Sequence, residues 1–396
     1  MTRNIEALVS PEAIIDRLPT GAYNTTFQPS YRDKKALVRA VHELQSTIPT
    51  TSVEHIMALR RQFREIALGQ MATFIIIEGS CAESVQLEQP IGPLVDQMTM
   101  RREAVVRGAT NPSGDTGILH IVRDRGQAVK PRSSATEQSG DAIIDSYFGD
   151  GVNNMAITKR TPDPSRMVAM ALQARDLNDA YTDRFGAHIP AAHEALLMPY
   201  EMARIQGGYN LSADLPWIGM RTNTLGHPIV NMLTDIHNPV GVKIGANSTA
   251  AHIEGLDLAL NPDQEDGKLA FMLRVETEAS RQLDEILAAI ASLRSRPIIM
   301  YDIHGVTRTN HHGEKIRSVP AIVGQVARLA SACRGHGLQL NGLHLETMAD
   351  DSHTECVDQP DDRPSRPGFV DPRLNPRQLE TIVRQSIEYI HELGGN

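Results

Sequence analysis

The chain has little cysteine, few aromatic residues and no long apolar run. It contains 3 cysteines and 1 tryptophan in 396 residues, and aromatic residues make up 4%. Cys81, Cys333 and Cys356 are odd in number and widely spaced, which argues against a disulfide framework and favours a cytoplasmic location. No apolar stretch approaches the roughly 20 residues that cross a bilayer, so no membrane association is expected. The N-terminal residues do not have the apolar core of a signal peptide.

Positive charge is also scarce, since the formal net charge is -9. This balance argues against nucleic acid as the main partner. It does not exclude an anionic small molecule, because basic residues can gather in one cleft. The sequence has no Walker motif and no dinucleotide fingerprint, so no organic cofactor is expected.

Eight apolar segments alternate with helical patterns, which predicts a parallel α/β fold. The segments are the isoleucine-rich run after Thr73, Gly117–Val122, His188–Ala192 (the weakest), Leu215–Gly219, Pro239–Gly245, Lys268–Arg274, Pro297–Gly305 and Leu338–Glu346. Helical spacing covers residues 32–45, 52–69, 95–107, 165–183, 222–236, 249–260, 276–293, 317–334 and 378–393. Eight such units predict a single eight-stranded parallel β/α (TIM) barrel with inserted loops over residues 51–396. Residues 1–50 are expected to form an N-terminal helical extension.

The alternative fold is an open doubly wound sheet. Polar residues follow nearly every predicted strand, whereas an open sheet concentrates its site at one switch point. In a barrel these residues share the C-terminal rim, where active sites lie. They are Cys81, Arg123, His193, Glu194, Arg221, Lys243, Arg274, His304 and Glu346. The long polar segment from residue 125 to 164 is expected to be a functional loop or lid.

Four residues could together bind one divalent metal. Cys81, His304 and Glu346 stand at predicted strand ends, and Asp371 lies in a turn after the last strand. A mixed set of sulfur, nitrogen and oxygen donors suits a Zn, Mn, Fe or Co ion and differs from the cysteine-rich sets of purely structural zinc sites. Taken singly, Cys81 could instead be a nucleophile or a buried small residue, and His304 a core histidine.

A group of cations predicts an anionic substrate. The group comprises Arg123, Lys130, Arg132, Arg221, Lys243 and Arg274. So many cations at one barrel mouth would repel each other without anions, and arginine matches the geometry of phosphate and carboxylate. Lys243 could alternatively be a Schiff-base lysine.

Several motifs together resemble one enzyme family. They are Gly79-Ser-Cys-Ala-Glu83, Lys130-Pro-Arg-Ser133, His193-Glu-Ala-Leu-Leu197, Trp217-Ile-Gly-Met-Arg-Thr222, Gly241-Val-Lys-Ile-Gly245, His304-Gly305, Gly342-Leu-His-Leu-Glu346 and Asp371-Pro-Arg-Leu-Asn375. In this order they resemble the class II 3-deoxy-D-arabino-heptulosonate 7-phosphate (DAHP) synthases. The overall length resembles short members linked to secondary metabolism.

The resemblance implies a metal-dependent transferase of the shikimate pathway that condenses phosphoenolpyruvate with erythrose 4-phosphate. It implies one divalent metal, such as Mn or Co, on Cys81, His304, Glu346 and Asp371. Phosphoenolpyruvate would bind Arg123, Arg221, Lys243 and Arg274, with Lys130 near its reacting carbon. Arg132 and Ser133 would bind the aldehyde phosphate. A homo-oligomer is also expected.

Four segments depart from the family pattern. Met220 replaces the glutamate of Gly-Glu-Arg-Thr, and Gln127-Ala-Val-Lys130 replaces Gln-Tyr-Ala-Lys. Tyr301-Asp-Ile-His-Gly-Val-Thr307 replaces Asp-Pro-Met-His-Gly-Asn-Thr, and Leu273-Arg-Val-Glu276 replaces Gly-Arg-Met-Gly. Two alternatives therefore stay open: a phosphoenolpyruvate aldol synthase that uses another aldehyde, such as an aminated one, and a catalytically silent binding or regulatory paralogue.

Overall fold

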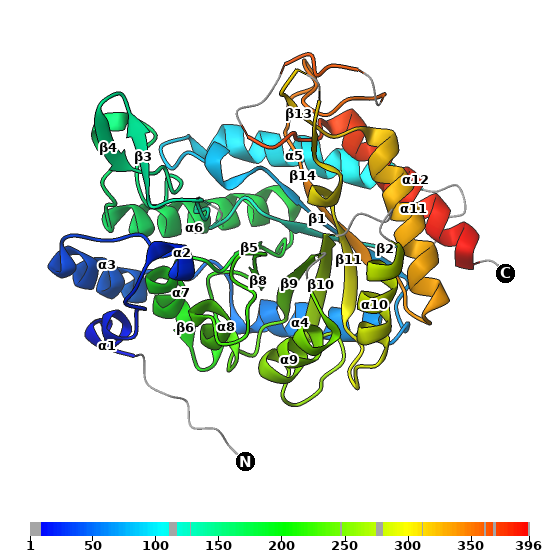
Figure 1. Ribbon diagram of the computed structural model, residues 1–396, viewed down its shortest axis with the longest axis horizontal. Helices are drawn as coiled ribbons and strands as arrows, with labels where there is room; N and C mark the ends of the chain where they lie inside the picture. Colours follow the sequence, from blue (N-terminus) through cyan, green and yellow to red (C-terminus); the bar gives the residue numbers. More distant parts are fainter. Residues whose placement is uncertain are drawn as a thin grey trace. The chain divides into compact units, whose positions relative to one another are not determined.

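Parallel strands alternate with helices in the computed structural model of the chain (Figure 1). The structure describes residues 9–110, 117–126, 128–245, 248–274, 280–310, 312–359, 362–366 and 370–394. The strands of the main sheet are β1 (Thr73–Gly79), β2 (Gly117–Val122), β5 (Ala192–Glu194), β8 (Leu215–Ile218), β9 (Val240–Gly245), β10 (Leu269–Arg274), β11 (Ile298–Asp302) and β14 (Gly342–Glu346).

The eight strands follow one another in the order β2-β1-β14-β11-β10-β9-β8-β5. The pairs β1/β2, β1/β14, β11/β14, β10/β11 and β5/β8 are parallel. Three short antiparallel hairpins are β3 (Thr136–Ser139) with β4 (Ala142–Asp145), β6 (Ile205–Gln206) with β7 (Tyr209–Asn210), and β12 (Arg308–Thr309) with β13 (Lys315–Ile316). The predicted eight-stranded parallel β/α barrel class is confirmed.

Twelve α-helices are described. They are α1 (Pro11–Asp16), α2 (Tyr23–Thr26), α3 (Lys34–Ser46), α4 (Val53–Ala67), α5 (Ile91–Ala109), α6 (Ser165–Phe185), α7 (Met198–Arg204), α8 (Pro228–Leu233), α9 (Ala250–Leu260), α10 (Ser280–Ala291), α11 (Val319–Gly335) and α12 (Pro376–Gly394). Among the described residues, no helix has both the length and the hydrophobicity that crossing a bilayer requires.

The chain divides into two compact units. Among the described residues, unit 1 takes in the chain up to Leu59, Ala82–Ile91 and Arg123–Val240, and unit 2 takes in the remaining segments. In unit 2, strands β1, β10, β11 and β14 are almost wholly buried, as are the last four residues of β2. Its helices contact one another in chain order, α9 with α10, α10 with α11, and α11 with α12. Unit 2 therefore contains most of the sheet, with helices that follow its strands.

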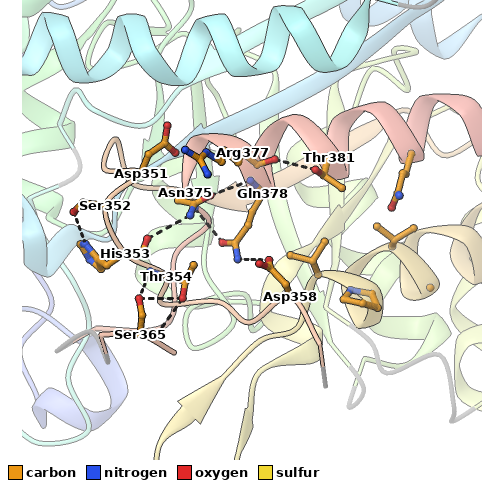
Figure 2. Close-up of a pocket in the computed structure, with 15 residues that line it drawn as sticks. Asp351, Ser352, His353, Thr354, Asp358, Ser365, Asn375, Arg377, Gln378 and Thr381 are labelled. Atoms are coloured by element: carbon orange, nitrogen blue, oxygen red, sulfur yellow. Dashed lines mark hydrogen bonds between the residues drawn. The ribbon is translucent and has the colours of Figure 1, made fainter. Parts of the chain in front are cut away.

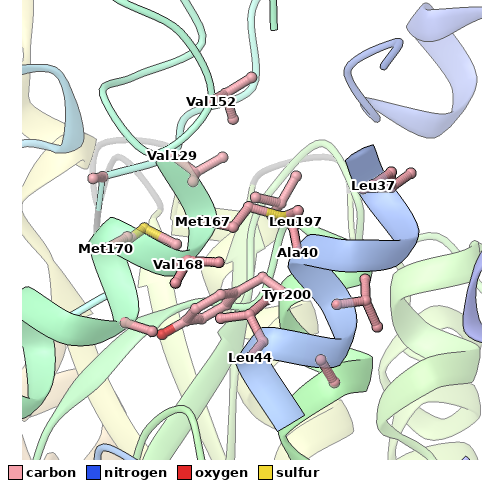
Figure 3. Close-up of a cluster of buried hydrophobic side chains, with 14 of the residues drawn as sticks. Leu37, Ala40, Leu44, Val129, Val152, Met167, Val168, Met170, Leu197 and Tyr200 are labelled. Atoms are coloured by element: carbon pink, nitrogen blue, oxygen red, sulfur yellow. The ribbon is translucent and has the colours of Figure 1, made fainter. Parts of the chain in front are cut away.

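The core of unit 1 joins the N-terminal helices to the segments after β2. Figure 3 shows Leu37, Ala40 and Leu44 of α3 packed against α6 and α7. Tyr200 of α7 is 1% exposed within this cluster, and α1 contacts both α3 and α7. The predicted extension thus shares a hydrophobic core with the rest of unit 1 (Figure 3). The domain boundary at residue 50 stays a prediction.

Two elements begin later than the sequence predicts. The strand expected over residues 188–192 is β5, which begins only at Ala192. The residues before it contact the Asp214 carboxylate, which accepts a hydrogen bond from Ala191 N at 2.7 Å and lies 3.1 Å from His188 Nε2. The helix expected over residues 222–236 is only α8. Gly226 has φ +80°, and the ring of His227 accepts from Ile229 N as the helix cap, so a turn precedes the helix.

Other differences lie near predicted strand ends. The polar segment 125–164 contains the β3/β4 hairpin, and the last strand begins at Gly342, after a turn at Gly337 (φ +70°). The strand expected to run through His304 ends at Asp302. The expected start of the helix at 276 lies outside the described residues, as does Gln127.

Candidate active site

The position of His304 is set by the residue at the end of β11. Asp302 is the N-cap of a short 3-10 helix, Ile303–Val306, and its Oδ1 accepts from His304 N at 3.1 Å. The same oxygen lies 2.6 Å from His304 Nδ1. Burial alone would raise the pKa of Asp302, but Lys243 and His304 hold that pKa well below its usual range. An ionised carboxylate can only accept, so Nδ1 carries the proton.

The other ring nitrogen of His304 faces two carboxylates of unit 2. Its Nε2 lies 3.1 Å from Glu346 Oε1 and 3.9 Å from Asp371 Oδ2. Strands β11 and β14 are parallel neighbours, so their carboxyl ends bring His304 and Glu346 to the same edge. Leu374 N donates to Glu346 O at 2.9 Å and ties the turn containing Asp371 to the end of β14.

The outer oxygens of these carboxylates are bonded to cations. Arg317 Nη1 donates to Glu346 Oε2 at 2.7 Å, and Lys315 Nζ donates to Asp371 Oδ1 at 2.7 Å. Burial would lower the pKa of the Arg317 guanidinium, but Glu346 raises it. Each carboxylate therefore turns its other oxygen toward His304.

This arrangement fits a divalent metal ion. His304, Glu346 and Asp371 each offer one donor atom, and these atoms lie within 4.8 Å of one another. Nitrogen and carboxylate oxygen donors suit Mn, Fe, Co and Zn. A metal-binding histidine usually donates its second ring N–H to a carboxylate, as His304 does to Asp302.

A second group of possible donors shares His304. Asp302, His304 and His344 also lie within 4.8 Å by one atom each. However, Asp302 Oδ1 bonds His304 Nδ1 at 2.6 Å, and Asp302 Oδ2 lies 3.0 Å from Lys243 Nζ. A metal ion there would have to replace a contact of Asp302, whereas Glu346 Oε1 and Asp371 Oδ2 face His304 Nε2, so the group with Glu346 and Asp371 fits a metal better.

Cys81 lies at the end of β1, also in unit 2. Its side chain is 1% exposed, and its Sγ lies 4.0 Å from the main-chain oxygen of Asp371. Next to it, Ser80 Oγ accepts from Arg373 Nη1 at 3.0 Å, and Glu355 holds that guanidinium at 2.6 Å. Cys81 is not in the three-donor group found among the described residues, so its role as fourth ligand stays a prediction.

Two predicted phosphoenolpyruvate ligands belong to unit 2. Lys243 lies within β9 and is 8% exposed. Its pairing with Asp302 reaches across β10, which separates β9 from β11 in the sheet. Arg274 is the last residue of β10 and is exposed. Lys243 therefore contacts Asp302, the residue that holds His304. Within the described part of the chain, no such contact is found for Arg274.

Lys130, predicted near the reacting carbon of phosphoenolpyruvate, and Arg132, predicted to bind the aldehyde phosphate, lie in unit 1 and meet at one carboxylate. Lys130 Nζ lies 2.6 Å and Arg132 Nη1 3.4 Å from the same oxygen, Glu83 Oε1. Tyr23 Oη accepts from Arg132 N at 2.8 Å. Arg221 Nη1 donates to Pro131 O at 2.9 Å, which joins the turn after β8 to this segment. Three predicted cations therefore gather around the Lys-Pro-Arg-Ser segment.

The remaining predicted residues of unit 1 differ in exposure. Arg123 is 4% exposed, and its guanidinium carbon lies 5.2 Å from the centre of the Trp217 ring, a cation–π distance. Ser133 is exposed, and Met220 is half-buried in the turn after β8.

His193 and Glu194 of β5 have different surroundings. His193 is wholly buried, and its Nε2 lies 2.8 Å from Glu201 Oε1 and 3.2 Å from Ser212 Oγ, a structural network. The Glu194 carboxylate occupies the space that a side chain at Gly219 would need. Glycine at 219 therefore permits this close approach.

Family comparisons agree with the motifs. Residues 20–183 and 182–384 match the "Class-II DAHP synthetase family". This chain belongs to that family. Its enzyme class, a transferase-type aldolase of class II, is the one predicted from the sequence.

Curated relatives of this DAHP synthetase family member are similar over most of their length. A "Probable phospho-2-dehydro-3-deoxyheptonate aldolase" of Pseudomonas fluorescens is 28% identical over 90% of this chain and 93% of the relative. A "Phospho-2-dehydro-3-deoxyheptonate aldolase" of Streptomyces coelicolor is 26% identical over 83% and 86%. The solved structure of an enzyme of that name from Francisella tularensis SCHU S4 aligns with TM-score 0.51 at 14% identity, covering 99% and 98%, which supports the fold.

Three residues around the DAHP synthetase motifs have no role predicted from the sequence. Arg317 holds Glu346, Tyr23 holds Arg132, and Asp302 holds His304. The spacing Asp302-Ile-His304 was the available signal, because an aspartate two residues before a histidine can cap its turn. The contacts of Arg317 and Tyr23 span more than 25 residues and have no local signal.

A cavity of about 840 Å³ in unit 2 lies apart from the predicted ligands. It is lined by α11 and α12 and by the segment that includes His353 and Asp358 (Figure 2). Gln378 Nε2 donates to Asp358 Oδ1 at 2.8 Å across one wall. None of the predicted site residues lines this cavity.

Proposed function

We propose that the chain condenses phosphoenolpyruvate with erythrose 4-phosphate to give DAHP and phosphate, with one divalent metal ion bound. The observation that carries the metal part of this proposal is the arrangement of His304 Nε2 beside Glu346 Oε1 and Asp371 Oδ2. Family membership supports the reaction. In this reaction the enol carbon bonds to the aldehyde carbon, water adds at the adjacent carbon, and phosphate leaves.

The metal would be held by Cys81, His304, Glu346 and Asp371. It would supply Lewis-acid polarisation of the aldehyde carbonyl. The buried Arg317 keeps Glu346 turned toward His304, and Asp302 keeps the proton of His304 on Nδ1. These contacts orient the donors before any ligand binds.

The cations would bind the anionic substrates. In the proposal, Arg123, Arg221, Lys243 and Arg274 bind phosphoenolpyruvate. Lys130 lies near its reacting carbon, and Arg132 with Ser133 binds the aldehyde phosphate. The shared contact with Glu83 supports a common positioning of Lys130 and Arg132. Arginine and lysine here neutralise phosphate and carboxylate groups.

The direct test is phosphate release. Purified protein with Mn²⁺ and both substrates is expected to release phosphate, and neither substrate alone should support release. The His304→Ala variant should be inactive while remaining folded. Absence of release by the wild type with Mn²⁺, Co²⁺ and Zn²⁺ would contradict the proposed reaction.

A second candidate differs only in the aldehyde. It is favoured by Met220, which is half-buried where the family pattern has a glutamate, and by the altered segment before His304. Phosphate release from phosphoenolpyruvate with a panel of phosphorylated aldehydes, aminated tetroses included, would separate the two. A silent paralogue is less supported, because the donors and the cations are both present. A homo-oligomer and a cytoplasmic location remain proposals.

A further inference from the structure

Asp302 contacts two functional candidates with its two carboxylate oxygens. Oδ1 accepts hydrogen bonds from His304 Nδ1 at 2.6 Å and from His304 N at 3.1 Å. Oδ2 lies 3.0 Å from Lys243 Nζ. The Asp302 carboxylate is wholly buried, and the Lys243 side chain is 10% exposed. One buried carboxylate therefore joins a predicted metal ligand to a predicted phosphoenolpyruvate ligand.

We propose that Asp302 is a positioning residue that sets the ring orientation of His304 through Oδ1 and the place of the Lys243 ammonium through Oδ2. The inference rests on the proposed function, since it concerns how the proposed metal and substrate ligands are held. Asp302 itself does not bind the metal. Both of its oxygens are engaged, whereas Glu346 Oε1 and Asp371 Oδ2 face His304 Nε2.

The backbone explains how Asp302 reaches both partners. Asp302 is the last residue of β11, and its capping of the following 3-10 helix brings His304 N and Nδ1 to one oxygen. In the parallel register it pairs with His344 of β14, whose Nδ1 lies 3.4 Å from Oδ1. Lys243 approaches Oδ2 from β9, which lies on the side of β11 opposite β14 in the strand order.

This arrangement separates two kinds of substitution. In Asp302→Ala both contacts are lost. In Asp302→Asn the amide oxygen can still accept from His304 Nδ1, but the amide nitrogen cannot accept from Lys243. The alanine variant therefore tests both contacts, and the asparagine variant tests mainly the contact with Lys243.

Mn²⁺ binding to the purified full chain, measured by calorimetry without substrate, gives a readout independent of activity. The wild type is expected to bind one Mn²⁺ per chain. Asp302→Ala should weaken Mn²⁺ binding by about 10- to 100-fold, the range for partners that orient a metal-binding histidine. Asp302→Asn should lose less Mn²⁺ affinity than Asp302→Ala, because its amide oxygen can still accept from His304 Nδ1, but its KM for phosphoenolpyruvate should rise several-fold as Lys243 loses its anchor.

Asp350→Asn is the matched control. Asp350 Oδ2 lies 3.1 Å from His353 Nδ1, so it is a carboxylate–histidine pair of the same unit that contacts none of the proposed ligands in the described contacts. This variant should bind Mn²⁺ as the wild type does. Circular dichroism and urea unfolding of every variant report whether it is folded.

The outcomes are distinguishable. Folded Asp302→Ala that binds Mn²⁺ as tightly as the wild type would overturn the inference and leave the proposed function standing. Two Mn²⁺ per wild-type chain, falling to one in Asp302→Ala, would overturn it by making Asp302 a ligand. If Asp302→Ala does not fold, Asp302→Asn decides. A loss of Mn²⁺ affinity as large as that of His304→Ala, or an unchanged KM for phosphoenolpyruvate, would overturn the inference. A wild type without Mn²⁺ affinity would overturn the proposed metal site, and this inference with it.

Discussion

His304 Nε2 lies 3.1 Å from Glu346 Oε1, and the two residues follow neighbouring parallel strands, β11 and β14. The orientation of each side chain is fixed by a hydrogen bond to a neighbouring residue. Asp302 holds the far nitrogen of the ring, and Arg317 holds the far oxygen of the carboxylate. His304 Nε2 and Glu346 Oε1 are therefore held facing each other, which is the preorganisation that a metal site requires.

Arg317 should be essential for stability as well as for the site. Its guanidinium is wholly buried and donates to Glu346 Oε2 at 2.7 Å and Pro372 O at 2.5 Å. Arg317→Met leaves Glu346 buried without its cation, which should lower the free energy of unfolding by about 3–5 kcal/mol. Urea unfolding in the absence of metal measures this loss.

The control for Arg317→Met is Arg363→Met. Arg363 pairs with Glu314 at 2.6 Å, but its side chain is 59% exposed. Exposed ion pairs contribute little, so this variant should unfold at the same urea concentration as the wild type. Equal losses of unfolding free energy in the two variants would show that burial does not increase the contribution of the Arg317–Glu346 pair to stability.

Glu78 should make stability depend on acid pH. Burial alone would raise the pKa of Glu78, but Arg101 at 2.9 Å and His120 at 3.0 Å lower it from 4.5 to about 2. Because the folded pKa is below the unfolded one, this contribution is complete above pH 4.5 and is lost as pH falls toward 2.

Glu78→Gln tests this pH dependence. At pH 6 the variant should be less stable than the wild type by a few kcal/mol, on the order of 3–5, since Arg101 is left buried without its carboxylate. The difference between wild type and variant should shrink as the pH is lowered from 4.5 toward 2. A difference that is constant across this range would show that Glu78 is not the titrating group.

Glu83 should affect the aldehyde phosphate through Arg132 and the reacting carbon of phosphoenolpyruvate through Lys130. It accepts from Lys130 at 2.6 Å and lies 3.4 Å from Arg132, so Glu83→Gln weakens the anchor of both cations. We expect a higher KM for the aldehyde phosphate and a kcat lower by about 10-fold, since misplaced catalytic groups lose rate steeply. Steady-state kinetics with each substrate varied in turn measures both.

Glu137→Gln is the matched control for Glu83→Gln. Glu137 binds Arg160 Nη1 at 2.6 Å in the same unit, beside no predicted substrate ligand in the described contacts. Its kinetics should equal those of the wild type. If the two variants lose activity alike, the effect of Glu83 is structural rather than specific to Lys130 and Arg132.

The fold and the donor set were predictable because strand ends leave a strong pattern. An apolar run followed at once by His304 or Glu346 places the side chain at the sheet edge, and parallel topology makes those edges coincide. Asp371 was predicted from its place in the turn after the last strand. In the structure the donor atoms of His304, Glu346 and Asp371 lie within 4.8 Å of one another. The sequence indicated that these residues belong together but not how close they lie.

The orientation of these residues was not predictable. Whether Asp302 turns to Nδ1 of His304 depends on a one-turn 3-10 helix, and Arg317 reaches Glu346 from another part of the chain. Likewise, the meeting of Lys130 and Arg132 at Glu83 joins segments separated by more than 45 residues. Such contacts come from tertiary packing, which local patterns do not encode.

Mn²⁺ binding by calorimetry to the wild type, His304→Ala and Glu346→Ala, with Asp350→Asn as control, tests the proposed metal site. We expect one Mn²⁺ per chain for the wild type and the control, and a loss of more than about 100-fold in affinity for both alanine variants, beyond the range for residues that only orient a ligand. Unchanged affinity in folded His304→Ala and Glu346→Ala would contradict the proposed metal site.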